Sequence, residues 1–494
     1  MANETTQQSD QQSFFTTLIG HCKEYGFIFP SSEIYDGLSA VYDYGQLGSQ
    51  LKKNIRDEWW KSMTQLHENI VGIDAAIFMH PTVWKASGHV DNFSDPMIDN
   101  KDSKKRYRVD HLIEGFADEL KKKDENAANA LLSSMDELLK NDDYPGLKKL
   151  IEDNKISCTV SKTANWTDVR QFNLMFSTEF GAVSSEEGEN IVYLRPETAQ
   201  GIFVNFLNVQ KTGRMKIPFG IAQIGKAFRN EIVARQFIFR MREFEQMEMQ
   251  FFVRPGSQME WYRYWKETRR KWHESMGIPS EKLRYHDHTK LAHYADAALD
   301  IEFEFPFGWK ELEGIHSRTD FDLSQHAKYS KKKIQYFDND LNEEGKPIGN
   351  YTPYVVETSV GLDRLFLTIL SLAYAEEKWQ KEDGSEDSRV VLRIPAKIAP
   401  TKLAILPLLK KDGLPELARE LMDECKSSFM CFYEEKDAIG KRYRRMDAIG
   451  TPFCVTIDHQ TKEDRTVTIR YRDDMKQERI PMSEVKKRVL EKIG

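Results

Sequence analysis

The chain has 494 residues, a length that suggests two to four domains. Hydrophobic residues make up 40% and charged residues 30%, a composition typical of a soluble globular protein. No apolar run approaches the roughly 18 residues needed to cross a bilayer. The polar N-terminus lacks the features of a secretory signal, so we expect a cytoplasmic protein with no membrane partner. The net charge is −7, yet residues 395–494 carry 21 Lys+Arg against 17 Asp+Glu. A basic excess in this part is compatible with a polyanionic partner, or with an ordinary solvated surface.

The N-terminal third combines a helix, a strand and a charged segment. Residues 45–67 are predicted to be helical, because apolar side chains recur every four positions. A strand is predicted over Ile70–Met79, ending before Pro81. Residues 101–155 are charged and helix-prone, as expected of an insertion on a larger core. The apolar residues of the first helix are Leu47, Leu51, Ile55, Trp59 and Met63.

The middle of the chain is rich in strand patterns. A strand after Val355 leads into an apolar helix over Leu365–Glu376, and the polar residues 378–388 are predicted to be a linker. Strands are predicted over four further ranges, which are 172–176, 191–194, 218–228 and 237–253.

The last hundred residues alternate between strand and helix patterns. This alternation predicts a small α/β domain with a largely parallel sheet. Strands are expected over 402–409, 429–433 and 453–457, and helices over 414–425 and 439–449.

The segment Phe228–Phe252 carries the densest chemistry in the chain. Two strand-like arms flank a turn at Val233–Gln236, which predicts an antiparallel hairpin. Alternate residues of a strand share a face, so one face of the second arm would be polar and the other apolar. The expected polar face holds Arg240, Arg242, Phe244, Gln246 and Glu248, and the apolar face holds Phe239, Met241, Met247, Met249 and Phe251.

Such a polar face suits a nucleoside triphosphate. Guanidinium groups bind phosphate oxygens in pairs, and an aromatic ring offers a stacking plane for a base. Phe244 and Glu248 would lie roughly 13 Å apart along a strand, about the distance from a stacked adenine to a group beyond the α-phosphate. Cross-strand Arg–Glu salt bridges on a surface strand remain the alternative interpretation.

Three motifs in order carry a family resemblance. FRNE with RxREF resembles motif 2 of the class II aminoacyl-tRNA synthetases, ETSVGLDR (Glu357–Arg364) resembles motif 3, and the helix and strand before Pro81 resemble motif 1. Together with RPETAQG, REFEQME and RTDFDL, the chain resembles the homodimeric glycyl-tRNA synthetase family. The resemblance implies an α+β fold with an antiparallel catalytic core over 1–390, a helical insertion over about 101–157 and an α/β anticodon-binding domain over 395–494.

The resemblance also implies an ATP site. Arg229 should hold the α-phosphate, Arg240 and Arg364 the γ-phosphate, and Phe244 the adenine, while Glu311 is a candidate ligand of the Mg²⁺ that accompanies ATP. Catalytic roles fall to Arg229, Glu231 and Arg364. The full candidate ATP site comprises Arg229, Asn230, Glu231, Phe239, Arg240, Met241, Arg242, Glu243, Phe244, Glu311, Leu312, Gly361, Leu362, Asp363 and Arg364.

For glycine, the resemblance implies a pocket of carboxylates around Glu197, Glu248 and Glu357. Carboxylates attract an ammonium group, and an intruding methyl group would break their hydrogen bonds. Arg108 matches a substrate contact, although the neighbouring Arg106 is the other candidate. The candidate glycine site comprises Arg108, Glu197, Phe244, Glu245, Gln246, Met247, Glu248, Glu357, Thr358, Ser359, Val360 and Gly361.

The five cysteines form no CxxC pair, so reduced and mostly buried thiols are expected. Some relatives carry CxxC where this chain has Asn100 and Ser103, and a further cysteine pair where only Cys158 remains. Asn and Ser cannot replace thiolates around zinc, so no structural zinc is expected. Metal analysis that found about one zinc per chain would contradict this.

The expected partners are glycine, ATP, tRNA(Gly) and a second copy of the chain. The C-terminal basic excess would then contact tRNA phosphates and anticodon bases. Two alternatives stay open: a sibling synthetase for another amino acid, and a non-catalytic protein on the same fold, such as the accessory subunit of the mitochondrial DNA polymerase. The latter would have no reason to keep Arg229, Glu231, Phe244, Glu311 and Arg364 together.

Overall fold

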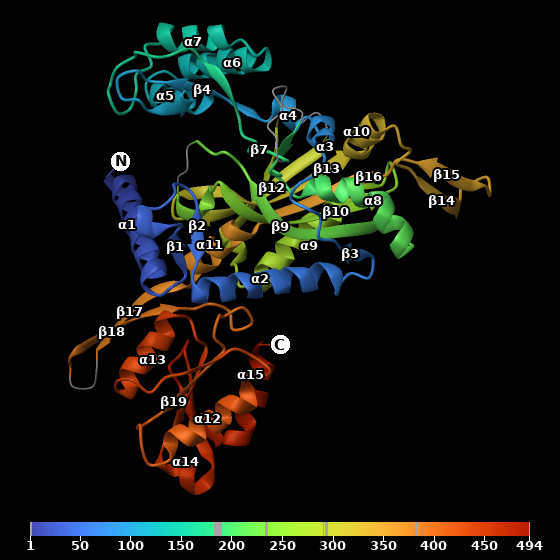
Figure 1. Ribbon diagram of the computed structural model, residues 1–494. Helices are drawn as coiled ribbons and strands as arrows, with labels where there is room; N and C mark the ends of the chain where they lie inside the picture. Colours follow the sequence, from blue (N-terminus) through green and yellow to red (C-terminus); the bar gives the residue numbers. More distant parts are fainter. Residues whose placement is uncertain are drawn as a thin grey trace. The chain divides into compact units, whose positions relative to one another are not determined.

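A computed structural model describes residues 2–181, 190–232, 236–289, 291, 295–380 and 384–493 (Figure 1). The chain divides into two compact units. Unit 1 comprises residues 1–75, 198–226 and 236–494, and unit 2 comprises residues 76–197 and 227–235. No helix in the described ranges is both long and apolar enough to cross a membrane.

A seven-stranded sheet forms the centre of unit 1, with the strand order β11-β12-β13-β16-β10-β9-β3. The pairs from β11 to β10 are antiparallel, whereas β3 pairs with β9 in parallel. This agrees with the expected antiparallel core. The strands are β3 (Ile70–Gly72), β9 (Phe219–Phe228), β10 (Glu243–Val253), β11 (Leu283–Asp287), β12 (Ala297–Phe305), β13 (Gly308–Thr319) and β16 (Tyr354–Gly361).

Helices cover the apolar face of this sheet. Met247, Met249 and Phe251 alternate along β10 and pack into one cluster with helices α1, α2, α9 and α11. The predicted stripe on α2 is confirmed, because Leu51, Ile55, Trp59 and Met63 are buried there. The helices of this region are α1 (Ala2–Glu24), α2 (Gln46–Thr64), α8 (Ala199–Gly213), α9 (Gln258–Ser275), α10 (Phe321–Ser330) and α11 (Leu362–Ala373).

The predicted strand Ile70–Met79 is wrong in length. Strand β3 ends at Gly72, and the backbone N–H of Ile73 makes one further bond to the Ala222 carbonyl at 2.9 Å. Asp74 and the alanines that follow have low strand propensity. Pro81 begins helix α3 (Pro81–Ala86), where a residue without an N–H is well placed.

The predicted linker at 378–388 is also wrong, because its described residues belong to an antiparallel hairpin. Strand β17 (Tyr374–Gln380) pairs with β18 (Glu386–Leu392), from Tyr374 opposite Leu392 to Gln380 opposite Glu386. The expected helix Leu365–Glu376 accordingly ends at Ala373. Arg389 of β18 is buried and pairs with Glu377 of β17 at 2.6 Å.

The C-terminal part of unit 1 has its own sheet, β20-β19-β21-β22-β23, and its own apolar core. Leu403 and Ile405 of β19 face helix α12, while Ala404 and Leu406 face α13, so helices cover both faces. The sheet is only partly parallel, because β22 and β23 are antiparallel additions. The elements are β19 (Leu403–Pro407), α12 (Leu414–Cys425), β20 (Cys431–Tyr433), α13 (Ile439–Ala448), β21 (Phe453–Ile457), α14 (His459–Asp464), β22 (Thr466–Tyr471), β23 (Gln477–Pro481) and α15 (Val485–Ile493).

Unit 2 contains the predicted helical segment. Helices α5 (Val109–Lys121), α6 (Glu125–Lys140) and α7 (Tyr144–Asp153) lie side by side (Figure 1). Their apolar faces pack with Trp166 and Val169 into a core separate from that of unit 1. A three-stranded sheet of β5 (Arg106–Arg108), β4 (Ser94–Asp99) and β6 (Arg170–Asn173) accompanies them. A two-stranded sheet pairs β7 (Ser177–Glu179) with β8 (Ile191–Tyr193).

Candidate active site

Polar side chains gather on one face of the three central strands of the large sheet. Glu248 lies opposite Ser359, and Gln250 lies opposite Glu357. On the other side of β16, His316 of β13 lies opposite Glu357. Residues directly opposite each other project from the same face of a sheet, so these five side chains form one polar surface.

Glu248 is 2% exposed and its carboxylate is held from several sides. Its Oε1 accepts hydrogen bonds from the Ser359 hydroxyl at 2.8 Å and from the Gln246 amide at 3.2 Å. The Thr198 hydroxyl donates to the other oxygen. These bonds fix the orientation of a negative charge inside the protein.

Glu357 is 4% exposed and is held by three donors. Gln250 Nε2 lies 2.6 Å from Oε2, His316 Nδ1 lies 3.0 Å from Oε1, and Arg318 NH1 lies 3.3 Å from Oε2. Burial alone would lower the pKa of His316, but its bond to the Glu357 carboxylate prevails and raises it. The negative charge of Glu357 is thus balanced by Arg318 and, when it is protonated, by His316.

A second cluster surrounds Arg364 at the start of α11. Its guanidinium lies 2.9 Å from the Glu311 carboxylate and stacks 4.5 Å from the centre of the Phe239 ring. The helix N-terminus adds positive potential at this point. The structure therefore brings three predicted ATP-site residues together.

The predicted hairpin needs correction at its second arm. Phe237–Phe239 form a 3-10 helix, and β10 begins only at Glu243, so the predicted continuous strand over 237–253 is wrong. The reason is packing, because Phe239 is buried against Phe305 and Phe307. The common face therefore starts at Phe244 and excludes Arg240 and Arg242. Of the predicted turn, Val233, Ala234 and Arg235 lie outside the described residues.

Several candidate residues lie in the core. All are buried with 0–4% exposure, within or beside the sheet's apolar packing, and their side chains leave no surface for a ligand in this structure. They are Met241, Met247, Leu312, Thr358, Val360 and Leu362.

Two candidate carboxylates instead bind Lys52. The Asp363 and Glu245 side chains each approach the Lys52 ammonium at 2.7 Å. Glu243 pairs with Lys226 at the edge of the site.

Unit 2 holds five of the candidates, whereas Gly361 ends β16 in unit 1. Arg229 Nε donates to the Pro196 carbonyl at 3.1 Å, and its guanidinium lies 5.5 Å from the centre of the Phe93 ring. Asn230 and Glu231 follow it in the chain, and the Asn230 backbone N–H donates to the Leu174 carbonyl at 2.8 Å. Glu197 lies 3.4 Å from His89.

The two arginines of β5 differ in their surroundings. Arg106 makes a bidentate pair with Asp99, at 2.7 and 2.9 Å, on an exposed surface. Arg108 is less exposed and lies between Asp95, at 3.2 Å, and Asp110. Arg108 therefore has the more enclosed position of the two.

Hydrogen bonds hold the loop at Asn100. The Asn100 side-chain oxygen accepts from the Ser103 backbone N–H and from the Ser161 hydroxyl, both at 2.9 Å. Ser103 Oγ lies 3.3 Å and Tyr107 OH lies 3.1 Å from Cys158 Sγ. All five cysteines are free thiols and four are buried, as predicted. Among the described residues, no group of three or more His, Cys, Asp or Glu has metal-binding geometry.

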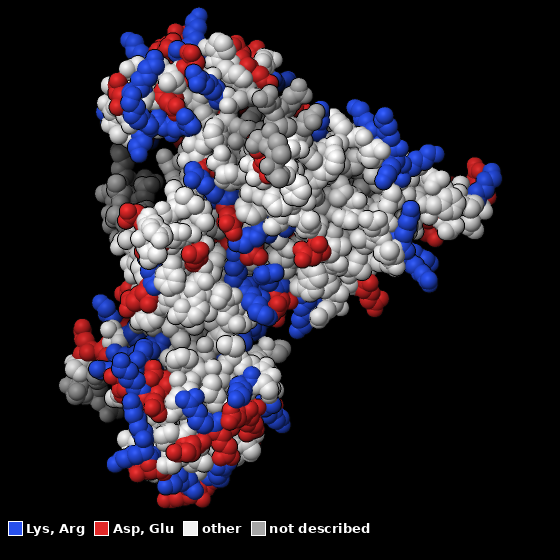
Figure 2. All heavy atoms as spheres, viewed as in Figure 1, with Lys and Arg blue, Asp and Glu red and all other residues white. Residues whose placement is uncertain are grey.

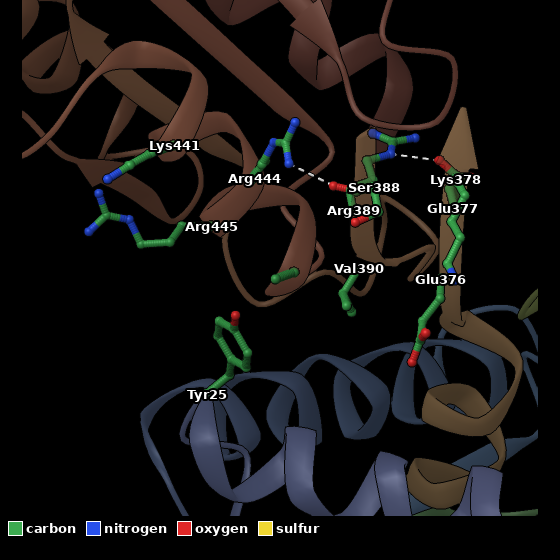
Figure 3. A pocket seen from close by; sticks show the side chains of 11 residues that line it. Tyr25, Glu376, Glu377, Lys378, Ser388, Arg389, Val390, Lys441, Arg444 and Arg445 are labelled. Atoms are coloured by element: carbon green, nitrogen blue, oxygen red, sulfur yellow. Dashed lines mark hydrogen bonds and ion pairs between the residues drawn. The ribbon is translucent and has the colours of Figure 1, made fainter. Parts of the chain in front are cut away.

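A cleft of about 380 Å³ opens beside α13 within unit 1 (Figure 3). Lys441, Arg444 and Arg445 line it from α13, and Tyr25, the first residue after α1, faces them. Lys and Arg side chains gather over α13 on the face shown in Figure 2, with carboxylates between them. Arg444 is anchored to the Ser388 carbonyl at 2.7 Å, whereas Lys441 is exposed.

Comparisons with known proteins identify the family. Two family models match: "Anticodon binding domain" over residues 402–492, and "Glycyl-tRNA synthetase insertion domain 1" over residues 95–130 and 122–174. A glycine–tRNA ligase of Chlorobaculum tepidum is 56% identical over 469 residues, covering 94% of this chain and 97% of that protein. The chain belongs to the glycine–tRNA ligase family. Glycine–tRNA ligases of Treponema denticola and Staphylococcus aureus are each 50% identical, over 97% and 96% of this chain and 97% and 98% of their own lengths.

Within this glycine–tRNA ligase fold, the sequence interpretation included Gln246 and Ser359 but missed the other groups that hold the two carboxylates. Gln250 could have been found, because it lies two residues after Glu248 and therefore on the same face of the strand as Gln246 and Glu248. Arg318 lies in the RTDFDL segment, which carried the family resemblance. Thr198 likewise lies in the RPETAQG segment. His316 had no local signal, because its role arises from Glu357, which is distant in sequence.

Proposed function

We propose that the chain activates glycine with ATP to glycyl-adenylate and then transfers the glycyl group to the 3′ end of tRNA(Gly). The observation that carries this proposal is the pair of anchored carboxylates, Glu248 and Glu357, on the polar face of β10 and β16. Their chemistry agrees with the ligase activity named for relatives that cover nearly the whole chain.

Glycine would be selected by charge and by lack of room. The Glu248 and Glu357 carboxylates favour an ammonium group, and their bonds to Ser359, Gln250 and Thr198 prevent them from swinging aside. A hydrophobic pocket rejects one methyl group by only about 1–3 kcal/mol. Displacing a bonded, buried carboxylate costs more, because its donors are left unpaired.

ATP would bind where Arg364 now pairs with Glu311 at 2.9 Å. This ion pair presents a cation for the γ-phosphate and a carboxylate for the Mg²⁺ that enters with ATP. We expect the pair to separate as the Mg·ATP complex enters between its members. Phe244 would stack on adenine, with Arg240 on the γ-phosphate, and Arg229 and Glu231 of unit 2 keep their proposed roles on the basis of resemblance.

In the reaction, the glycine carboxylate attacks the α-phosphate in line and releases pyrophosphate. A carboxylate is already a nucleophile, so positioning and charge neutralisation suffice without a general base. The terminal hydroxyl of tRNA then attacks the adenylate carbonyl and releases AMP.

The C-terminal domain would bind tRNA, since residues 402–492 match an anticodon-binding family. The cleft lined by Lys441 and Arg445 (Figure 3) is a candidate contact for tRNA phosphates, because Lys441 is exposed there and carries a positive charge. A homodimeric assembly, a cytoplasmic location and the lack of a structural zinc remain predictions.

The test is ATP–pyrophosphate exchange by the purified chain with each of the twenty amino acids, followed by charging of tRNA(Gly). We expect glycine to support exchange at least a hundredfold better than alanine or serine. Exchange driven by another amino acid would favour a sibling synthetase. Absence of exchange with every amino acid would favour a non-catalytic protein on this fold.

A further inference from the structure

One lysine on the buried side of α2 joins three segments that are far apart in the sequence. Lys52 is 8% exposed. Its ammonium lies 2.7 Å from an oxygen of Asp363, in the first turn of α11, and 2.7 Å from an oxygen of Glu245, near the start of β10. It also lies 4.1 Å from the centre of the Tyr44 ring.

The two carboxylates complete the network among themselves. The second oxygen of Asp363 accepts the backbone N–H of Glu245 at 2.7 Å, and the Tyr44 hydroxyl donates to the first. The second oxygen of Glu245 lies 3.4 Å from Arg56. Helix α11, strand β10 and helix α2 are thus held together by a closed set of polar bonds.

Stability alone does not account for this network. Buried charges lose their hydration, and well-packed apolar side chains of similar volume often stabilise as much or more. Burial alone would lower the pKa of Lys52, yet the Asp363 and Glu245 carboxylates prevail and raise it, so the ammonium stays charged. Polar bonds offer directional control of geometry, which apolar packing does not.

The positions of the two carboxylates show what that geometry controls. Asp363 directly precedes Arg364, whose guanidinium pairs with Glu311 and stacks on Phe239. Glu245 directly follows Phe244, and adjacent residues of a strand project from opposite faces. Lys52 therefore fixes the backbone at the residues next to Phe244 and Arg364, two residues of the candidate ATP site.

We propose that Lys52 is a positioning residue for ATP, which sets α11 and β10 so that Arg364 and Phe244 present their side chains to the nucleotide. This rests on the ATP-binding roles proposed above for those two residues. Lys52 itself does not touch substrate. Substitution of Lys52 is expected to weaken ATP binding more than glycine binding, because the hydrogen bonds that hold Glu248 and Glu357 do not involve Lys52.

The test compares Lys52→Met with Lys52→Arg in ATP–pyrophosphate exchange, with ATP and glycine varied separately. We expect Lys52→Met to raise KM for ATP at least tenfold and KM for glycine less than threefold. Lys52→Arg keeps the charge and should recover most of the ATP affinity. Lys53→Met is the matched control, because Lys53 is exposed and pairs with Asp57 on the outer side of the helix; it should change neither constant.

The proposal is overturned if Lys52→Met leaves KM for ATP within twofold, or raises both constants equally while lowering the melting temperature. If Lys52→Met does not fold, Glu245→Gln removes one of the two carboxylates, and the same ATP-selective rise is required of it. Phe244→Ala and Arg364→Ala are measured in parallel. If these two leave KM for ATP unchanged, the ATP site proposed above is wrong; if they raise it and Lys52→Met does not, only the present inference fails.

Discussion

At the scale of single residues, the two carboxylates of the polar face differ in their supports. Hydroxyl and amide groups hold Glu248, from Ser359 at 2.8 Å and Gln246 at 3.2 Å. Glu357 instead has Arg318 and a histidine, at 3.3 and 3.0 Å. The pH response of this face is therefore expected to come from His316, whose pKa is raised by its bond to Glu357.

His316→Gln tests this difference. The pKa of His316 is raised above 6.5 by Glu357, so the folded state binds this proton more tightly than the unfolded state. The resulting stability is complete below pH 6.5 and is lost as the pH rises through the raised pKa. Urea unfolding at several pH values should show the stability advantage of the parent over the variant shrinking from pH 6 to pH 9. A constant or growing difference would contradict the assignment.

Residue patterns predicted part of this site. The period of two along β10 placed Glu248 and Met247 on opposite faces, as the structure has them. The same period was extended too far back, because Arg240 and Arg242 precede the strand, in a segment anchored by buried Phe239. A local pattern has no information about where tertiary packing interrupts a strand.

At the scale of elements, the opposite face of β13 carries a buried ion cluster. Glu313 is fully buried and lies 2.6 Å from both Arg269 and His273 of α9. Burial would raise the pKa of Glu313, but Arg269 and His273 lower it, so the carboxylate stays charged. This cluster ties α9 to the strand that carries Glu311 and His316.

We expect Glu313→Gln to lower the free energy of unfolding by about 3–5 kcal/mol, because it leaves the Arg269 charge buried without its partner. Urea denaturation measures this. Glu304→Gln is the control on the neighbouring strand, where the pair with Lys282 is partly exposed, and it should cost less than about 1 kcal/mol. Equal losses for the two variants would show that the buried cluster has no special role.

Elements whose apolar residues recur with a regular period could be predicted from the sequence. Strands that depend on pairing with a neighbouring strand could not. The four-residue stripe of α2 and the alternation of the C-terminal domain were found from sequence, since each buries one side of its own element. The β17–β18 hairpin was predicted to be a linker, because the residues at its tip are polar and show no apolar alternation typical of strands. What stabilises it lies elsewhere in the chain: Arg389 pairs with Asp447 at 2.8 Å, which also binds Arg470.

At the scale of the whole molecule, activation and tRNA binding are assigned to different parts of the chain. Lys441→Ala should therefore raise KM for tRNA several-fold, reduce the salt dependence of tRNA binding by about one phosphate contact and leave ATP–pyrophosphate exchange unchanged. Lys487→Ala, an exposed lysine of α15 that pairs with Glu491, serves as the control. Equal effects of the two lysines would show that the cleft beside α13 contributes no specific contact.

Deletion of the residues after Arg393 is a broader form of the same experiment. It should weaken tRNA charging far more than ATP–pyrophosphate exchange. The deletion also removes Asp447, one of the two carboxylates that bind buried Arg389 of the hairpin, so part of any loss of exchange would come from a weakened hairpin. The point variants separate the two effects.

The central claim is that anchored carboxylates on the large sheet select glycine. The most direct measurement is the ratio of kcat/KM for glycine to that for alanine, in ATP–pyrophosphate exchange by Glu248→Ala and by the parent. We predict a lower rate with glycine together with a ratio reduced at least tenfold, because the substitution removes both the partner of the ammonium group and the wall against a methyl group. A lower rate with an unchanged ratio would contradict the claim that Glu248 excludes larger amino acids.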